Sequence, residues 1–348
     1  MRPIKKTNLS LDEFINLSLY DKNFGYYMKK NPFGKKGDFV TAPNISRLFS
    51  EMLAIWVITY WQSLGCPKKF NLIELGAGNG EMMKILINSF KSFPSFLKSC
   101  NIIIHEKSDR LIRIQKININ NKNILWLSNL KKIKPFPSIF LANEFFDAFP
   151  IKQFFKKKDI WFERYVNLAD KKKGKFMDKK FDMQKFEKKI NYKISKNQNI
   201  IEYSPKTFDY LKMISEIISK NKGGMLIIDY GYFDLKMKNT LQAVSNHKFS
   251  NLLEKIGSSD ITHNINFKFF EGIIKKFSDL ETITTNQKKF LTKMGITQRA
   301  EAISKNQPFS KKVDMFYRLK RLLDQNQMGS LFKVMLIKNK DNKFKIGF

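Results

Sequence analysis

Short apolar runs alternate with amphipathic segments along most of the chain after residue 70. The runs are five or six residues long, rich in Ile, Leu and Phe, and lie at 70–75, 101–105, 123–127, 138–142 and 224–229. Segments with helical spacing of apolar positions lie between them, at 80–92, 108–117 and 206–220. Such alternation predicts a parallel sheet with crossover helices, and continuous apolar runs predict strands that are buried on both faces. We therefore expect an α/β fold built on a mostly parallel, doubly wound sheet.

Further elements are expected at both ends of the chain. Asn8 or Ser10 can cap a first helix that runs through Leu19, and Ser46 can cap a second helix that runs to about Ser63. A helix around 310–325 is followed by an apolar strand at 331–337. The segment 20–43 joins the first two helices and mixes glycine, proline and aromatic residues. This mixture suits an ordered loop that faces a ligand, although the aromatic residues could instead fill the core.

One long segment, residues 152–203, interrupts the alternation of strands and helices. It reads as an inserted β-hairpin or small subdomain, with the basic run 171–180 as a solvated hairpin tip. The pattern as a whole predicts four parts. They are an N-terminal helical cap with its glycine- and aromatic-rich loop (1–66), the first half of the sheet (67–150), the Lys-rich insertion (151–204), and the second half of the sheet with its loops (205–340).

The composition describes a globular and very basic protein. The 348 residues are 43% hydrophobic, which excludes a disordered chain, and 64 Lys and Arg against 31 Asp and Glu give a net charge of +33. Only eight of the basic residues are Arg, and the Lys are spread along most of the sequence. Base-reading and bidentate phosphate contacts favour Arg. We therefore interpret the charge as solvated surface and expect no specific nucleic-acid partner.

The cysteines, the histidines and the apolar segments indicate in which cellular compartment the protein works and whether it binds a metal ion. Cys66 and Cys100 do not form a C-x-x-C pair, and the three histidines lack metal-ligand spacing, so we expect a reducing compartment and no metal site. The apolar helical stretch 52–61 is too short to span a bilayer. The opening ten residues lack an apolar signal segment and an Arg-rich presequence. The simplest expected location is a bacterial cytoplasm, without a membrane span.

A glycine-rich turn follows the first apolar run, in the sequence Glu74-Leu-Gly-Ala-Gly-Asn-Gly80. Glycine allows a sharp turn and lets the backbone approach a ligand that a Cβ would block. The spacing lacks the extra residue of the dinucleotide fingerprint, and a carboxylate precedes the first glycine by two residues. This arrangement suits a cationic cofactor better than a pyrophosphate, and S-adenosylmethionine meets the requirement. The predicted cofactor contacts in this turn are Glu74, Gly76, Ala77, Gly78 and Gly80.

Two further strand ends are expected to contribute to the cofactor site. Glu106 follows the second apolar run, where an acidic residue binds a ribose diol in dinucleotide folds. At the end of the third run, 123–127, the segment Trp126-Leu-Ser128-Asn129 could stack on the adenine or form a hydrogen bond with it. A glycine turn without any ligand is the alternative interpretation.

The fourth strand ends in an acidic and aromatic turn, Asn143-Glu-Phe-Phe-Asp-Ala-Phe-Pro150. Asn143, Glu144 and Asp147 would gather polar groups at the sheet edge where a transferable methyl group would lie, and Asn143 is also expected to contact the cofactor. A carboxylate there could position a nucleophilic nitrogen or take its proton. Phe145 and Phe146 could form the wall of a pocket. The alternative is that the acids only cap the turn.

Several segments in the same order resemble one protein family. They are Asp21-x-x-Phe-Gly-Tyr-Tyr-Met28, Gly37-Asp-Phe-Val-Thr-Ala-Pro43, the glycine turn, the acidic turn, Ile228-Asp-Tyr-Gly231 and Thr240-Leu-Gln-Ala-Val244. Together they resemble the class I methyltransferase family of mitochondrial dysfunction protein A, from about residue 8 to 337. Three positions depart from the family pattern: Asn44 stands where Glu is common, Ala77 where Pro is frequent, and Asn79 where Arg is frequent.

The resemblance implies a Rossmann-like methyltransferase core with an N-terminal cap that uses S-adenosylmethionine. In the mitochondrial branch of the family the substrate is an arginine of the complex I subunit near the quinone site, so protein arginine methylation is the expected function. A non-catalytic assembly chaperone that binds the cofactor, or methylation of another protein, a nucleic acid or a small molecule, are the alternatives. The resemblance adds Asp38, Thr41 and Pro43 to the expected cofactor contacts. The expected substrate contacts are Phe145, Phe146, Asp229, Tyr230, Gln242, His247 and His263.

Overall fold

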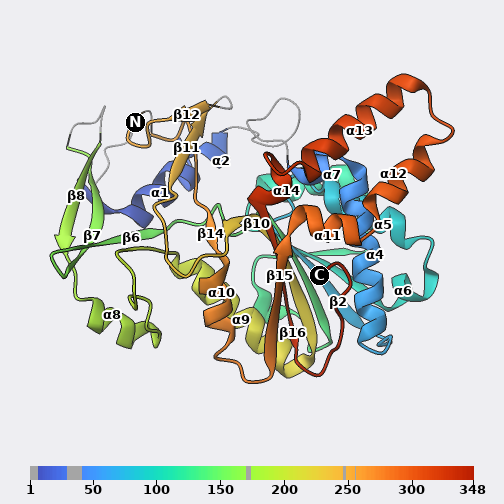
Figure 1. The fold of residues 1–348 in the computed structure, drawn as a ribbon, viewed down its shortest axis with the longest axis horizontal. Helices are drawn as coiled ribbons and strands as arrows, with labels where there is room; N and C mark the ends of the chain where they lie inside the picture. Colours follow the sequence, from blue (N-terminus) through green and yellow to red (C-terminus); the bar gives the residue numbers. More distant parts are fainter. Residues whose placement is uncertain (1–6, 30–40, 170–173, 246–247, 255) are drawn as a thin grey trace.

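A sheet of eight strands forms the centre of the computed structural model, which describes residues 7–29, 41–169, 174–245, 248–254 and 256–348 (Figure 1). The strand order is β15-β16-β10-β5-β2-β3-β4, with β14 beside β10. β16 runs antiparallel to both of its neighbours, and the other pairs are parallel. The strands are β2 (Phe70–Leu75), β3 (Cys100–His105), β4 (Ile124–Leu127), β5 (Ser138–Asn143), β10 (Gly223–Tyr232), β14 (Ile265–Asn266), β15 (Leu280–Asn286) and β16 (Phe332–Asn339).

All six apolar runs of the sequence are strands of this sheet, so the expected α/β fold is confirmed. The pattern missed two strands: β14, which has only two residues, and β15, whose sequence LETITTN has no apolar run. Its residues after Leu280 are only partly buried because β15 lies at the edge of the sheet.

Helices cover both faces of the sheet. Alternate residues of β10 show why: Leu226 and Ile228 belong to one apolar core, and Met225 and Ile227 belong to the other. The first core packs against α4 (Arg47–Ser63), α5 (Glu81–Phe90), α6 (Pro94–Ser99), α7 (Asp109–Ile119), α11 (Gln287–Lys293), α12 (Ile296–Ser304), α13 (Phe309–Leu323) and α14 (Met328–Leu331). The second packs against α9 (Pro205–Asn221), α10 (Phe267–Ile274) and the short 3-10 turn Leu130–Lys132. The predicted helices at 46–63, 80–92, 108–117, 206–220 and 310–325 are therefore confirmed.

A second, antiparallel layer lies beside the main sheet, on the left of Figure 1. It contains a sheet in the order β1-β7-β6-β9, with β8 also paired to β7, and a small sheet in the order β12-β11-β13. Its elements are β1 (Asn8–Ser10), α1 (Leu11–Tyr20), α2 (Tyr26–Lys29), β6 (Lys152–Lys157), β7 (Ile160–Asn167), β8 (Lys175–Lys180), α8 (Met183–Ile190), β9 (Ile200–Tyr203), β11 (Gln242–Ser245), β12 (Lys248–Ser250) and β13 (Asp260–Thr262). The insertion is thus β-rich, as expected.

Two sequence-based details differ from the structure. The basic run 171–180 was expected to be a hairpin tip. Its residues 171–173 lie outside the described residues, and Lys175–Lys180 forms strand β8, which pairs with β7 along its whole length. The segment 1–66 was expected to form one cap, but its described residues divide between the two layers. β1 pairs with β7 and α1 packs into the antiparallel layer, whereas α4 packs on the main sheet. Long-range strand pairing of this kind leaves no local signal in a three-residue segment.

The first helix begins as the sequence predicts. The Glu13 carboxylate accepts a hydrogen bond from the Ser10 backbone N–H at 2.9 Å, which is half of a capping box. Among the described residues every helix is too short or too polar to span a bilayer.

The order of the strands fixes where a ligand can bind. Chain order reverses between β2 and β5, which are neighbours in the sheet although β3 and β4 intervene in the sequence. Ligands of open α/β sheets bind at such a switch point, outside the carboxyl ends of the strands. The glycine turn after β2 and the acidic turn after β5 therefore lie side by side at this edge.

Helix α4 lies very close to the start of β10 because glycines replace side chains there. The Tyr60 hydroxyl donates to the Gly223 carbonyl at 2.8 Å, and the Tyr60 ring stacks on Trp56 and meets the edge of Phe344. A Cβ on Gly224 would lie 2.3 Å from the Tyr60 hydroxyl and 3.0 Å from the Ile337 carbonyl. The contact between helix and sheet thus depends on glycine at this position.

We expect Gly224→Ala to lower the free energy of unfolding by about 1–3 kcal/mol, the usual cost of overpacking a core. Urea denaturation measures the effect. In the double variant with Tyr60→Leu, which removes the phenol, the loss should be smaller than the sum of the two single losses, since residues in contact are not additive. Additive losses would contradict the proposed contact.

Candidate active site

The glycine turn adopts the backbone that its composition predicts. Gly76, Gly78 and Gly80 have φ values of 67°, 54° and 85°, in the left-handed region that side chains with a Cβ avoid. A Cβ on Gly76 would lie 2.8 Å from Cδ2 of Phe145, so the glycine also allows the two turns to touch. Ala77 is buried in the core beneath the turn. The turn is therefore held in a shape that presents backbone to the edge of the sheet.

Glu74 is buried at the end of β2, with a side chain that the protein does not satisfy. The residue is 3% exposed, and its Oε2 has no hydrogen-bond partner. Burial, with a smaller contribution from the charge of the nearby Glu106, raises the pKa of this carboxyl to about 8. A buried, unpartnered carboxylate is costly unless a ligand pairs with it. The turn and this orphaned oxygen together fit a cationic, S-adenosylmethionine-type cofactor.

Glu106 lies at the end of β3, next to the glycine turn, with both of its oxygens engaged. Oε1 accepts the backbone N–H groups of Lys107 and Ser108 at 2.8 and 2.9 Å, and Oε2 accepts the Gln115 amide at 3.2 Å. Burial raises the pKa of Glu106, while these three hydrogen bonds lower it. Ser128, the expected adenine contact, is exposed beyond β4. A ribose diol contact to Glu106 and an adenine contact to Ser128 stay predictions.

The acidic turn after β5 contains the strained residue of the site. Glu144 has a φ of 50°, which is uncommon for a residue other than glycine and is characteristic of functional sites. Its Oε1 accepts the Ala42 backbone N–H at 3.3 Å and the Asn143 amide at 3.1 Å. Burial raises the pKa of Glu144 to about 7. The Oδ1 of Asn143 is buried without a hydrogen-bond partner. Together with Glu74 Oε2, it is a second polar atom at this edge that a ligand could pair with.

Asp229 lies behind the acidic turn and holds it in place. It is fully buried at the end of β10, and its Oδ2 accepts the backbone N–H of Phe146 at 2.9 Å and of Asp147 at 3.4 Å, while Oδ1 accepts that of Tyr230. Hydrogen bonds from backbone N–H groups favour the charged form of the Asp229 carboxyl. Asp147, the neighbouring carboxyl, accepts fewer such hydrogen bonds. Burial and repulsion by Asp229 raise the pKa of Asp147 well above its ordinary value, so Asp147 keeps its proton to a higher pH.

The structure places the expected substrate residues at different depths. Phe145 is half-buried against Gly76, whereas Phe146 is fully buried against Phe270 in the core. Tyr230 is half-buried, with its ring centroid 4.1 Å from that of Phe332. His263 is buried, and burial lowers its pKa to about 4, which keeps the imidazole neutral near neutral pH. Gln242 donates to Thr262 within the small sheet.

The cap approaches the site through α3 (Ala42–Ile45). The Asn44 Oδ1 accepts the Asn79 amide at 3.1 Å, which connects α3 to the glycine turn, and Asn44 donates to the Thr41 hydroxyl at 2.8 Å. Pro43 is buried in this short helix. Asp38 and His247, two of the expected contacts, lie outside the described residues.

The antiparallel layer adds residues that sequence reasoning did not select. The Tyr27 hydroxyl donates to Asp260 Oδ1 at 2.9 Å, and the Tyr27 ring stacks on Tyr20 with a centroid distance of 5.5 Å. The Tyr20 hydroxyl donates to the Ala148 carbonyl, directly after Asp147. Burial raises the pKa of both Asp147 and Tyr27, and the charge of Asp260 adds to the rise at both residues. Tyr27 lies in the quoted Gly-Tyr-Tyr motif, the one signal that could have identified it.

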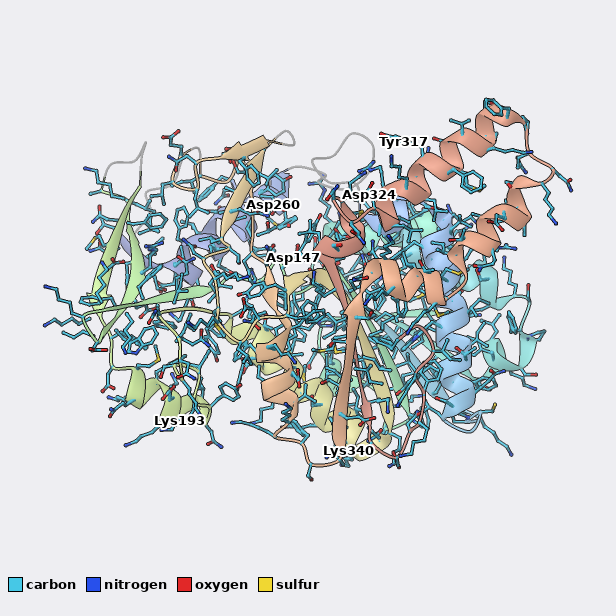
Figure 2. All side chains as sticks on the ribbon, viewed as in Figure 1. Asp147, Lys193, Asp260, Tyr317, Asp324 and Lys340 are labelled. Atoms are coloured by element: carbon cyan, nitrogen blue, oxygen red, sulfur yellow. The ribbon has the colours of Figure 1, made fainter. Side chains whose placement is uncertain are left out.

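Figure 2 shows where two of the acidic residues lie: Asp147 is at the centre of the molecule, and Asp260 is above it on the antiparallel layer. Lys340, for orientation, marks the opposite end of the main sheet. No group of three or more His, Cys, Asp and Glu that could hold a metal ion occurs in the part of the chain that the structure describes. The arrangement offers carboxylates and aromatic rings to cations at one edge of the sheet.

Comparisons with known proteins agree with this geometry. The chain is 29% identical to "Protein arginine methyltransferase NDUFAF7, mitochondrial" of Xenopus laevis over 95% of its own length and 81% of the relative, and 28% identical to the human protein of that name over 95% and 80%. A crystal structure of a Burkholderia thailandensis protein bound to S-adenosyl-homocysteine superposes with a TM-score of 0.81, at 21% identity, over 98% of this chain and 90% of that one, and therefore has the same fold.

A family profile described as "Putative S-adenosyl-L-methionine-dependent methyltransferase" matches residues 52–285, more than half of the chain. The matched region runs from the middle of α4 to the end of β15 and includes the glycine turn, the acidic turn and the strand end that carries Asp229. The family expected from the sequence and its cofactor, S-adenosylmethionine, are confirmed. The chain belongs to this family of S-adenosyl-L-methionine-dependent methyltransferases.

Proposed function

We propose that this methyltransferase acts on the guanidinium group of an arginine in a protein, and that the protein is a subunit of respiratory complex I near its quinone site. The observation that carries the proposal is a group of carboxylates at the carboxyl edge of the sheet that form no ion pair with any described residue, in a chain with a net charge of +33. The printed names of the relatives, which are protein arginine methyltransferases, support arginine as the acceptor.

The electrostatics of the acidic turn favour a cationic substrate. Burial raises the pKa of Asp147 and Asp229, and repulsion from Glu144 adds to the effect at both residues. None of these three carboxyls joins an ion pair within the described residues. Buried like charges are relieved when a cation enters between them. A guanidinium offers five N–H donors in a planar fork, which suits two or more carboxylates.

The residues that would hold the cofactor are those at the end of β2 and β3. Glu74 would face the positive charge of the cofactor, and the glycine turn would provide close backbone contact. Glu106 would accept hydrogen bonds from the ribose hydroxyls of the cofactor. When bound, the cofactor supplies a methyl group activated by a sulfonium. Asn143, with its unpartnered Oδ1, lies at the end of β5 between this side of the site and the acidic turn.

The chain's own residues would orient the acceptor nitrogen and receive its proton. Methylation would replace one N–H bond of the guanidinium by a nitrogen–carbon bond as the methyl group leaves the cofactor sulfur, so the acceptor nitrogen would have to give up one proton to the protein. With a pKa of about 7, Glu144 can accept that proton near neutral pH. Asp229 orients the turn through its backbone contacts, and the charge of Asp260 acts on Asp147, so both of these carboxyls would add negative charge near the acceptor.

A location in a bacterial cytoplasm stays a prediction that rests on the sequence. The names of the relatives include the word mitochondrial. Cell fractionation followed by immunodetection of the native protein decides between the two compartments.

The direct test is methyl transfer from radiolabelled S-adenosylmethionine to the purified complex I subunit near the quinone site. We expect acid-stable label in an arginine of that subunit, located by mass spectrometry, and no label when that arginine is replaced by Lys. Label in nucleic acid, or stable association of the two proteins without any label, would refute the proposal; the second result would favour an assembly chaperone.

Two substitutions test the roles of the acidic turn in the same assay. Glu144→Gln and Asp147→Asn should lower kcat by about 100-fold or more, the usual contribution of a positioned acid or base. The dissociation constant of S-adenosylhomocysteine should change by no more than a few fold. Asp341→Asn, at an exposed residue paired with Lys222 beyond the end of β16, is the control and should behave as wild type. Wild-type rates in both variants of the turn would remove these residues from the mechanism.

Replacement of Gly78 by Val is expected to abolish cofactor binding while the protein still folds. A branched side chain at φ 54° would both strain the turn and occupy the space of the ligand. Gly65→Val is a matched control, because Gly65 also has a positive φ, of 82°, but has no atom within 4 Å of the added Cβ. Calorimetric titration with S-adenosylhomocysteine measures both. Unchanged affinity in the Gly78 variant would contradict the cofactor site.

The raised pKa of Glu74 predicts a pH-dependent stability. Folding raises this pKa from 4.5 to about 8, so the folded state holds a proton that the unfolded state has lost, and Glu74 makes the protein less stable as pH rises through this window. Glu74→Gln should therefore gain stability relative to wild type between pH 5.5 and 8, by up to about 1.4 kcal/mol per pH unit. Denaturation at several pH values measures the gain, and exposed Glu301→Gln should follow wild type. A constant difference between Glu74→Gln and wild type would contradict the buried, protonated carboxyl.

A further inference from the structure

Gln115 connects three parts of the cofactor site, although it belongs to none of the motifs. It lies in α7 and is fully buried. Its Nε2 donates to the Gly78 carbonyl at 3.0 Å and to Glu106 Oε2 at 3.2 Å, and its Oε1 accepts the indole N–H of Trp126 at 3.0 Å. One side chain therefore contacts the glycine turn, the acidic residue after β3 and the aromatic residue of β4.

The orientation of the Gln115 amide follows from its partners. The indole of Trp126 is a donor only, so the atom that faces it must be the amide oxygen. The nitrogen then faces the Gly78 carbonyl and Glu106, and both of these are acceptors when Glu106 is ionised. All three hydrogen bonds are satisfied in one orientation, and the opposite orientation would satisfy none of them.

We propose that Gln115 is a positioning residue for the cofactor, which fixes the orientation of the Glu106 carboxyl group and connects it to the glycine turn. The two backbone donors hold Glu106 Oε1, and the amide of Gln115 holds Oε2, so the carboxylate has one orientation before the ligand binds. The same amide also donates to the Gly78 carbonyl. It therefore holds together Glu106, which is expected to bind the ribose, and the glycine turn, which is expected to lie near the sulfonium.

The electrostatics of Glu106 agree with this role. Burial raises the pKa of Glu106, and the hydrogen bond from Gln115 is one of the three that oppose the rise. Without this bond the carboxyl would protonate at a higher pH. A protonated carboxyl would have one less acceptor for a diol and would lose its fixed orientation.

Gln115→Leu tests the proposal through binding alone, so the outcome does not depend on which substrate is methylated. We expect the dissociation constant of S-adenosylhomocysteine, measured by calorimetry on the full-length protein, to rise by about 10- to 100-fold, the equivalent of one hydrogen bond to a charged group. The loss should deepen on acidification, and the decline in affinity should begin at a higher pH than in wild type. Trp126→Phe, which removes only the indole donor, should have a smaller effect of the same kind.

Gln287 provides a matched control for the loss of a buried glutamine. It is also fully buried, and its amide donates to the Leu322 carbonyl at 3.0 Å, in α11 and away from the cofactor residues. Gln287→Leu should lower the melting temperature but leave the affinity and its pH profile unchanged. If Gln115→Leu bound S-adenosylhomocysteine with wild-type affinity and pH dependence, or if both variants lost affinity equally, Gln115 would be a structural residue only and the proposal would be wrong.

Discussion

The structure depends on a set of buried carboxylates that gather at one edge of the main sheet and find no cation within the described chain. Glu74, Glu106, Glu144, Asp147 and Asp229 all have raised pKa values, with burial as the first cause in each case. Burying a charge is costly unless it is paired. The chain has 64 basic residues, and none of those that the structure describes forms an ion pair with these acids, so the site is open to cations from outside.

The rest of the fold supports this unfavourable arrangement. Apolar cores on both faces of the sheet fix the strand ends, so the acidic groups cannot separate without disrupting the packing. Asp229 holds the backbone of the acidic turn, and the turn in turn keeps Glu144 in a left-handed conformation. The glycine turn brings its backbone against Phe145 on the opposite side. Strain and unpaired charge thus accumulate where a ligand can relieve them, as is usual for catalytic sites.

Much of the sheet and the cofactor side of the site could be predicted because their signals are local. Five apolar runs with turns between them identify the buried parallel strands, and a glycine turn next to Glu74 identifies the ligand edge. The remaining contacts join residues far apart in the sequence. Gln115 looks like an ordinary polar residue of a helix, and its role appears only when β4 brings Trp126 beside it. Tyr27 and Asp260 are 233 positions apart, so no spacing rule connects them.

The two departures from the family pattern at Asn44 and Asn79 show how structure can reinterpret a sequence difference. Taken separately, each replaces a charge that is common in the family, Glu at position 44 and Arg at position 79. In the fold the two side chains contact each other at 3.1 Å. This hydrogen bond attaches α3 of the cap to the glycine turn, so Asn44 has a structural role that requires no contact with substrate.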